Sequence, residues 1–362
     1  YFQESDTSLE HFLSTKKRSE TNQFLTNDFV TAMHGEHWLW FSPDEVSKNL
    51  EILQIELAWL DRVNIYFLTK DGGHESFEAG DEHPFSDRVI AFRKPSFPLL
   101  REINQSEVDV VAIRISAQGR FSLPLFAVSE SAFNNQLKLD YLFYGAWIAI
   151  LIALGFYNAT IFFSLRYNMH LYYLIYIFVF TALLVIASGV AQQYVWPSNK
   201  NTTTLLANIS LALTNYGTAF FVINFIRLND LHRPFASLLK ILSYISVACM
   251  PLVFIYGYNA LTPILICSFA IMLVILLAAI YTTIKGDQLA PFLFSSLLVL
   301  LPCNTIGLAR FLGFFENQHW TEHVPELGLI ADAIILSLAL AYKVNLLRRE
   351  KDSVTTAREN EQ

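Results

Sequence analysis

The feature that most constrains this chain is a series of apolar segments between residues 141 and 342, broken only by short polar stretches. Only 13 of these 202 residues are Asp, Glu, Lys or Arg. A helix needs about 20 apolar residues to cross a hydrocarbon layer about 30 Å thick, because no water there can satisfy an exposed backbone group. The C-terminal half of the chain is therefore predicted to be a bundle of membrane-spanning helices.

Seven spans can be read from the hydropathy pattern. The uncharged stretch from Ile241 to Ile284 is too long for one helix, and Gly257, Asn259 and Pro263 mark a turn that divides it into two. The predicted spans cover about 141–165, 171–194, 203–226, two helices within 241–284, 288–315 and 322–345. Because the number of spans is odd, the two ends of the chain lie on opposite sides of the membrane.

The distribution of basic residues predicts the orientation, since Lys and Arg near span ends are retained in the cytoplasm. Such residues gather at alternate ends of the spans: Arg166, Arg227, Arg233, Lys240, Lys285, Lys343, Arg348, Arg349 and Lys351. Residues 1–140 are then outside. They hold 13 Lys and Arg against 22 Asp and Glu, a net charge of −9, whereas the remainder carries +2. This acidic balance argues against nucleic acid as a partner.

The outer segment shows the period of two that is typical of β-strands. The best candidates are 52–60, 63–68 and 108–115, with shorter ones at 38–41, 90–92 and 121–123. Several short strands at this spacing predict a β-sandwich. Residues 1–27 are predicted to be either an edge strand or disordered. We therefore divide the chain into an outer domain, 1–136, a seven-helix domain, 137–345, and a cytoplasmic segment, 346–362.

An exterior domain ahead of the first span needs export, so we expect a cleaved signal before Tyr1. All three cysteines, Cys249, Cys267 and Cys303, fall within predicted spans, which leaves the outer domain without a disulfide.

Short motifs in a fixed order now suggest a family. The outer domain carries Trp38-Leu39-Trp40-Phe41 and then Leu60-Asp61-Arg62-Val63-Asn64-Ile65-Tyr66. The membrane region carries Tyr144-Gly145, Tyr157-Asn158, Leu171-Tyr172-Tyr173, Gln193-Tyr194-Val195-Trp196-Pro197 and Leu336-Ser337-Leu338-Ala339-Leu340-Ala341. With the seven-span topology, this order resembles the bacterial seven-transmembrane receptors with diverse intracellular signalling modules.

The resemblance implies a fold and a function. It implies a membrane protein with an N-terminal all-β, jelly-roll-like sandwich, similar to carbohydrate-binding modules, followed by an all-α bundle of seven transmembrane helices. Such a receptor would lie in the bacterial inner membrane with its outer domain in the periplasm. It would pass a signal from a small extracytoplasmic ligand to a cytoplasmic output domain in cis, such as a diguanylate cyclase or histidine kinase. We expect any enzyme activity to lie in that output domain, beyond residue 362. The alternative is a transporter or channel with an exterior accessory domain.

Two charged residues inside predicted spans are candidates for a signalling pair. Arg310 lies near the outer end of span six and Asp332 about three turns into span seven, depths at which they could meet. Charges at such depth are costly unless they are paired or hydrated. The pair either fixes helix register only or acts as a switch that displaces span seven when ligand binds.

The candidates for exterior ligand binding are Trp40, Asp61, Arg62, Arg88 and Arg93. Aromatic faces stack on sugar rings, and Asp or Arg side chains bond hydroxyls or carboxylates. The competing interpretation assigns Trp40 to the sandwich core and Asp61-Arg62 to a turn, while the arginines stay undecided.

His319 and His323, with the neighbouring Glu316, Glu322 and Glu326, would place two imidazoles and a carboxylate on one side of a helix, as Zn²⁺ binding requires. No recognised motif accompanies them, so we interpret this segment as a solvated polar loop and expect neither metal nor cofactor.

The last residues leave two interpretations open. Leu347, Val354 and Ala357 fit a and d positions of a parallel coiled coil, which would make the receptor a homodimer. Glu350 and Glu361 interrupt that pattern, so a frayed, charged tail is the favoured interpretation.

Overall fold

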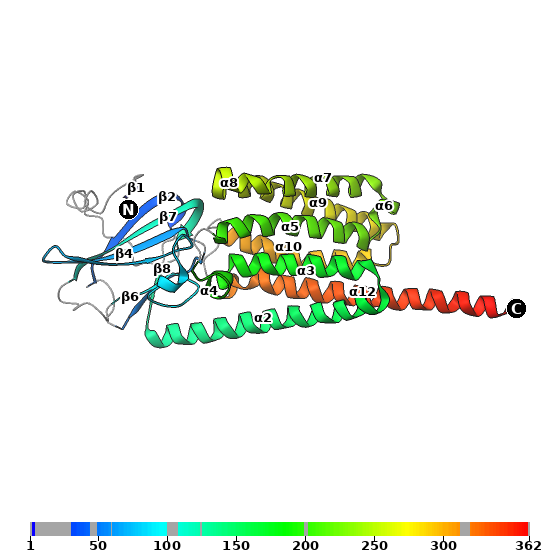
Figure 1. The fold of residues 1–362 in the computed structure, drawn as a ribbon, viewed down its shortest axis with the longest axis horizontal. Helices are drawn as coiled ribbons and strands as arrows, with labels where there is room; N and C mark the ends of the chain where they lie inside the picture. Colours follow the sequence, from blue (N-terminus) through cyan, green and yellow to red (C-terminus); the bar gives the residue numbers. More distant parts are fainter. Residues whose placement is uncertain are drawn as a thin grey trace.

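A computed structural model describes residues 2–3, 30–43, 49–58, 60–99, 108–123, 125–198, 202–311 and 319–360. Strands occupy one end of an elongated molecule and helices the rest, with the C-terminus at the far end (Figure 1). The predicted fold class is confirmed: a β-sandwich precedes an all-helical membrane domain.

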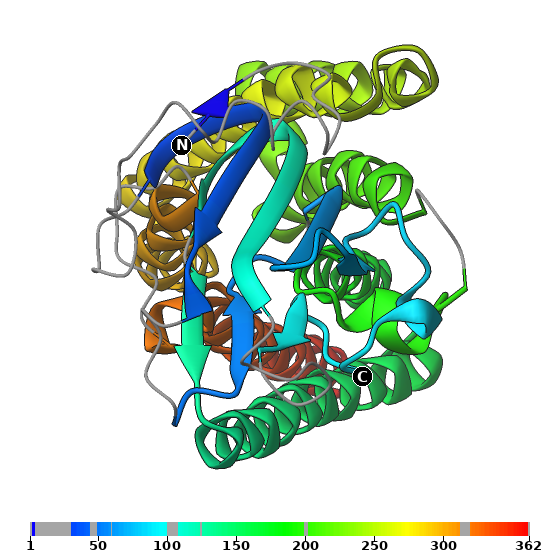
Figure 2. The same cartoon turned by 90° about the vertical axis from the view of Figure 1, so that its left-hand side faces the viewer.

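The outer domain consists of two antiparallel sheets. The larger has the order β1-β2-β7-β4-β5, formed by Phe2–Gln3, Val30–Phe41, Val108–Leu123, Arg62–Thr69 and His74–Ala79. The smaller has the order β6-β3-β8, formed by Ser96–Pro98, Ile52–Ile55 and Leu125–Val128. Figure 2 shows these strands lying across the end of the helical bundle.

Alternating side chains build the core of the sandwich. Leu39, Ile65 and Ile113 belong to one buried cluster, together with Leu53 and Phe97 of the smaller sheet. The residues between them in sequence face the opposite way and form a second cluster, which contains Trp38, Leu68, Val110, Ala112, Trp40 and Tyr66. The period of two seen in the sequence therefore reflects a sheet with two apolar faces.

The candidates 38–41, 63–68 and 108–115 lie within strands, whereas 52–60 is confirmed only for 52–55, because β3 ends at Ile55. Residues 121–123 prove to be the end of the long strand β7, and Phe2 and Gln3 pair with the edge of β2, which fits the edge-strand alternative for these two residues. The remainder of 1–27 lies outside the described residues. Residues 90–92 were expected to form a strand, and this is wrong: they belong to an irregular loop between Arg88 and Pro95.

Seven helices in the described part of the chain are long and apolar enough to cross a membrane. They are α2 (Glu130–Leu165), α3 (Asn168–Ala187), α5 (Thr202–Phe225), the segment Arg233–Tyr256, α9 (Leu261–Ile284), α10 (Ala290–Phe311) and α12 (Val324–Asn360). The fourth span combines α7 (Arg233–Ala248) with α8 (Val253–Tyr256) across a short 3-10 helix, Met250–Leu252, that contains Pro251. The predicted turn before the fifth span is confirmed at Gly257, whose φ is positive.

Three short α-helices lie between these spans in the part of the chain that the structure describes. They are α4 (Val190–Tyr194), α6 (Leu228–Leu231) and α11 (His319–Glu322).

Two helices are longer than a membrane crossing requires, with 36 residues in α2 and 37 in α12. α2 begins at Glu130, six residues before the end of the predicted outer domain, where the Ser129 side chain accepts a hydrogen bond from the Ala132 N–H. α12 continues to Asn360 at the opposite end (Figure 1), so the expectation of a frayed tail is wrong for residues 346–360. Its 37 residues correspond to about 55 Å of helix.

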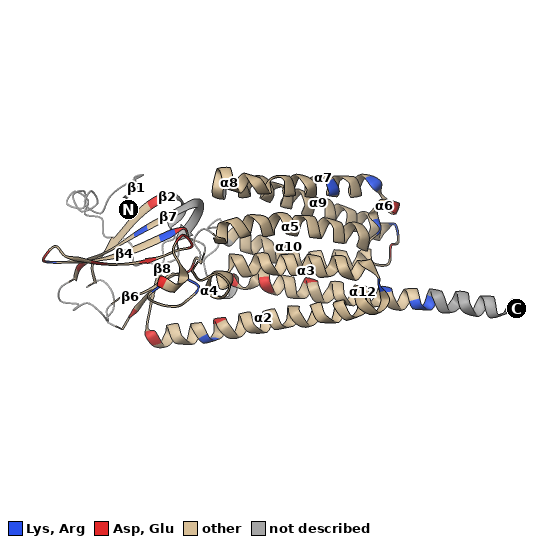
Figure 3. Ribbon diagram, viewed as in Figure 1, with Lys and Arg blue, Asp and Glu red and all other residues tan. Residues whose placement is uncertain are grey.

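Charges separate along the molecule as the orientation predicts. Lys and Arg gather at the helix ends farthest from the sheets, on α7 and α12, whereas Asp and Glu are concentrated in the outer domain and near it (Figure 3).

Candidate functional site

The two domains meet through a cluster of buried charges. We call Glu56, Arg93, Lys94, Asp140 and Glu322 the joint. Arg93 lies in the irregular loop that precedes β6, and its side chain is only 2% exposed. Its Nε and Nη2 atoms donate to the two oxygens of Asp140 on α2, each at 2.6 Å. This bidentate pair fixes both position and orientation.

The same guanidinium also reaches the last helix region. Its Nη2 atom donates to Oε1 of Glu322 at 2.6 Å, and Nη1 donates to the Ser188 carbonyl at 2.9 Å. Glu322 ends α11, directly before α12 begins. One side chain of the outer domain therefore binds groups at the outer ends of three membrane helices.

Lys94 completes the joint from the next position in the loop. Its Nζ donates to the second oxygen of Glu322 at 2.6 Å and also to Glu56, which follows β3. Lys94 is fully buried and Glu322 is 8% exposed. Glu322 is thus shared by two cations of the outer domain.

Burial makes these contacts sensitive to the loss of any member. Desolvation alone would lower the pKa of Arg93, but the charge of Glu322 and the hydrogen bonds and charge of Asp140 hold that pKa well above its ordinary value. Removing one partner of a buried pair leaves an uncompensated charge, which typically costs about 3–5 kcal/mol. The joint is therefore a place where small displacements have large energetic consequences.

Aromatic groups surround the joint on the bundle side. The His323 ring lies 4.0 Å from that of Phe143, and its Nε2 is 3.9 Å from Asp140 Oδ1. The Tyr144 ring lies 4.8 Å below the Arg93 guanidinium, and its hydroxyl is 3.5 Å from Glu326. Such a cation–π contact adds to the attraction of the carboxylates.

Arg88 forms a second anchor beside the joint. Its Nη1 atom donates to the carbonyls of Phe92 and Arg93, which fixes the loop that carries the joint, and Nη2 donates to Gln192 of α4 at 2.8 Å. Burial lowers the pKa of Arg88 to about 10, while the nearby Asp81 opposes that shift. Arg88 therefore remains a cation at neutral pH.

A glycine permits the two domains to approach so closely. Gly189, between α3 and α4, has a φ of 82°, and a Cβ there would lie 2.8 Å from the Ala58 Cβ and 3.2 Å from the Arg93 carbonyl oxygen. Only glycine adopts this conformation readily and also leaves room for the outer domain.

Polar contacts continue down α12 from the joint. The Tyr176 hydroxyl of α3 donates to Asp332 at 2.6 Å, and the Tyr173 hydroxyl donates to the Ala333 carbonyl at 2.7 Å. Further toward the cytoplasm, Asn158 of α2 donates to Ser337 at 3.0 Å. We call these contacts, at Asp332, Ala333 and Ser337, the polar column of α12.

Three of the buried side chains have the chemistry of metal ligands. Ligand atoms of Asp140, Glu322 and His323 lie within 4.8 Å of one another. However, Arg93 already binds both carboxylates at hydrogen-bond distance, so a cation there would have to displace a guanidinium. The geometry fits an ion-pair network better than a metal centre.

The predicted ligand-binding residues lie in different places. Arg93 is part of the joint and Arg88 lies beside it. Asp61 is buried just before β4. Arg62 forms an exposed ion pair with Glu82, and Trp40 packs half-buried in the second cluster of the large sheet. The structure brings Arg88 and Arg93 together but places Trp40 on a different face.

The predicted signalling pair is described only in part. Asp332 is buried and bonded to Tyr176, whereas the side chain of Arg310 lies outside the described residues. The pairing of Arg310 with Asp332 therefore stays a prediction.

Sequence reasoning missed the function of the segment before α12. Glu322 and His323 were expected in a solvated polar loop, and this is wrong, because both are buried at the joint. Asp140 was also overlooked. A signal was available, since Asp140 directly precedes the first predicted span and Glu322 begins the last, so both lie where the spans meet the outer domain.

Comparison with known proteins places this geometry in a family. The family described as 7TM diverse intracellular signalling matches residues 140–343, more than half of the chain. The chain belongs to this family. The description 7TMR-DISM extracellular 2 matches residues 9–129, the sheet-rich region. Among curated proteins, none matches the chain. A protein of the 7TM diverse intracellular signalling family is a transmembrane receptor with an extracellular sensor and an intracellular signalling role.

Proposed function

We propose that this receptor lies in a bacterial inner membrane and converts binding of a small periplasmic molecule into a displacement of α12. The observation that carries this proposal is the bonding of Arg93, on the sensor domain, to both Asp140 on α2 and Glu322 before α12. If the sensor moved by a fraction of an ångström, all three bonds of Arg93 would change at once. Because buried ion pairs tolerate little misalignment, such a displacement favours a second discrete arrangement of these bonds.

The polar column supplies the next step of the mechanism. α12 is held at three positions by hydrogen bonds to α2 and α3, two of them at adjacent residues, and it continues into the cytoplasm as one helix. A shift at Glu322 therefore moves a rigid rod rather than a hinged chain. In this proposal α12 drives an output module such as a diguanylate cyclase or histidine kinase, and any catalysis belongs to that module.

The ligand class we propose is a saccharide or a small carboxylated molecule, bound on the aromatic face of the large sheet. Trp40 and Tyr66 lie on this face, and the Tyr66 ring is 6.3 Å from that of His74. Arg114 and Glu36, which are ion-paired across β7 and β2, stand next to them. Flat rings beside charged groups suit sugar hydroxyls, as in the carbohydrate-binding jelly rolls that the sequence resembles.

The proposed coupling of the joint to α12, which we call the relay, can be tested without knowing the ligand. Spin labels are placed at Ser237 on α7 and Asn345 on α12, in a chain whose three native cysteines are replaced, and distances are measured in nanodiscs. Arg93→Met should shift or broaden the distance by about 2 Å, the scale of helix movements in switching proteins. Arg114→Met, which removes a cation far from the joint, should leave it unchanged. Identical distributions in wild type and Arg93→Met would refute the relay.

A further inference from the structure

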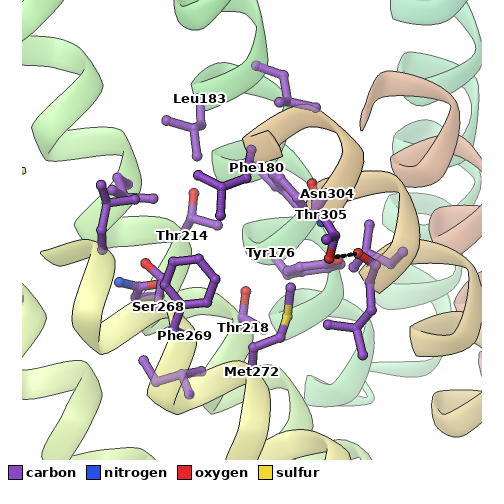
Figure 4. Close-up of a pocket in the computed structure, with 18 residues that line it drawn as sticks. Tyr176, Phe180, Leu183, Thr214, Thr218, Ser268, Phe269, Met272, Asn304 and Thr305 are labelled. Carbon is purple, nitrogen blue, oxygen red and sulfur yellow. Dashed lines mark hydrogen bonds between the residues drawn. The ribbon is translucent and has the colours of Figure 1, made fainter. Parts of the chain in front are cut away.

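A cavity of ≈ 280 Å³ lies between helices of the bundle, apart from the joint, and it is open on one side, since Phe269 in its wall is 58% exposed. α3, α5, α9 and α10 contribute its walls (Figure 4). Leu184 lies near the outer end of α3, Leu265 near the outer start of α9, and Leu308 near the outer end of α10. The cavity is therefore in the outer half of the membrane, below the sensor.

The walls define the polarity of a suitable ligand. All of the lining residues are described, and none of them is charged. Leucines, two phenylalanines and Met272 form most of the surface, with a few Ser, Thr and Asn side chains spread between them (Figure 4). A charged molecule would lose its hydration without gaining a counter-ion, so a neutral lipophilic molecule is favoured.

The polar groups further define the ligand's hydrogen bonding. Thr214 donates its hydroxyl proton to the Ser210 carbonyl at 2.8 Å, Ser268 to Ile264 at 3.0 Å, and Thr305 to Leu301 at 2.8 Å. Each proton is used within its own helix, so the oxygen offers lone pairs to an incoming group. These three oxygens can therefore accept from a ligand that donates a hydrogen bond, while Thr218 and Asn304 add further polar groups to the wall.

We propose that this cavity binds a small, neutral, lipophilic molecule that carries an O–H or N–H donor. Binding does not depend on the proposed relay. The site nevertheless adjoins it, because Tyr176 lines the cavity with its ring while its hydroxyl bonds Asp332 of α12. An occupant therefore presses on a residue of the polar column, which gives the receptor a membrane-borne input besides its sensor.

Photolabelling of the full chain in phospholipid nanodiscs tests the site. The probe is 1-decanol with a diazirine in its chain, and adducts are mapped by mass spectrometry. We expect adducts on the lining residues of α5, α9 and α10. At equal concentrations in the membrane, 1-decanol should displace the probe about tenfold better than n-decane, since only the alcohol donates a hydrogen bond. Equal displacement by the two competitors would overturn the proposal.

Two adjacent residues of α9 supply matched variants. Met272 lines the cavity, whereas Leu273 is 58% exposed on the outside of the bundle. Met272→Trp should fill the cavity and reduce labelling at least about tenfold, while Leu273→Trp leaves it unchanged. If Met272→Trp does not fold, the double variant Ser268→Ala and Thr305→Ala serves instead, and it should remove the advantage of decanol over decane. Labelling that is unaffected by these changes refutes the site.

A bilayer chain is the alternative occupant. A phospholipid with a diazirine in its acyl chain is used in a separate arm of the experiment. Adducts on the cavity walls that 1-decanol does not displace would show that a lipid tail fills the space, which contradicts the proposal.

Discussion

Helices α12 and α7 both cross the membrane, yet their neighbours hold them in different ways. α12 contacts α2 and α3 through buried polar groups, with the Tyr176–Asp332 bond deep in the bundle. α7 lies at the rim, where Leu238, Ile241 and Tyr244 are 42–55% exposed, and Ser246 accepts a hydrogen bond from Asn215 of α5. The difference separates a helix with a fixed register from one that packs mainly through apolar surface.

This contrast indicates how a signal can pass through the bundle. Apolar contacts change gradually as helices slide, whereas a hydrogen bond in a low dielectric is either made or broken within a short distance. A helix held by the polar column therefore has discrete positions, and α12 also begins next to Glu322 of the joint. α7 lacks such a connection to the joint in the described part of the chain.

The largest expected effect comes from removing the cation that links α12 to the sensor. Arg93→Met leaves Asp140 and Glu322 buried without their guanidinium, so the free energy of unfolding should fall by about 3–5 kcal/mol. Thermal unfolding of the purified chain in nanodiscs measures this loss. Arg93→Lys keeps the charge but not the two parallel bonds, and it should give an intermediate value.

Arg114→Met is the matched control for this loss. Arg114 pairs with Glu36 on a partly exposed surface of the outer domain, where such pairs contribute about 0–1 kcal/mol. If the two Met variants unfold at the same temperature, Arg93 is not the anchor described above.

The next effect sharpens the comparison of α12 with α7 directly. Tyr176→Phe removes the proton that Asp332 accepts and should cost about 1.5–3 kcal/mol, the usual range for a hydrogen bond to a charged group. Tyr244→Phe on α7 removes a hydroxyl from a side chain that is 53% exposed, so it should have little effect. Thermal unfolding of both variants without denaturant provides the measurement. Equal losses of stability in the two variants would contradict the special position of α12.

A smaller effect is expected where the bundle and sensor touch without charges. Gly189→Ala places a Cβ against Ala58 in a positive-φ conformation, which by itself costs about 1–2 kcal/mol. We expect faster proteolysis of the loop from Arg88 to Pro95 as well, because Arg93 must shift. Gly145→Ala on α2 meets open space and should be neutral or slightly stabilising. Equal protease resistance in both variants would show that close docking is not required.

The sequence predicted more of the membrane domain than of the joint, for a physical reason. A span is a local property, and the uncharged stretch from Ile241 to Ile284 defines two helices without reference to anything else. The joint is a meeting of Arg93, Asp140 and Glu322, which are separated by 47 and 182 residues, and each taken alone is typical of a solvated loop or helix end. The charge of Arg93 makes it a candidate binding residue in the sequence, but its partners depend on how the sensor docks.

The smallest expected effect concerns pH and a carboxyl group beside the second anchor. Burial raises the pKa of Asp81 well above its ordinary value, the charges of Asp61 and Glu82 raise it further, and Arg88 and Thr204 oppose the shift. In the unfolded chain Asp81 loses its proton at lower pH than in the folded chain. Its contribution to stability is therefore complete below the unfolded pKa and is lost as pH rises through the folded pKa.

Asp81→Asn should accordingly flatten the decline of unfolding temperature with rising pH, measured as a series of thermal scans. Asp71 supplies a control of opposite sign, because hydrogen bonds from Thr69 and Gly73 lower its pKa, so its contribution is lost on acidification instead. Asp71→Asn should thus alter only the acid side of the profile. A profile that Asp81→Asn leaves unchanged would mean that this carboxyl is hydrated when the domains dock, and that the contact between sensor and bundle is looser beside Arg88 than at Arg93.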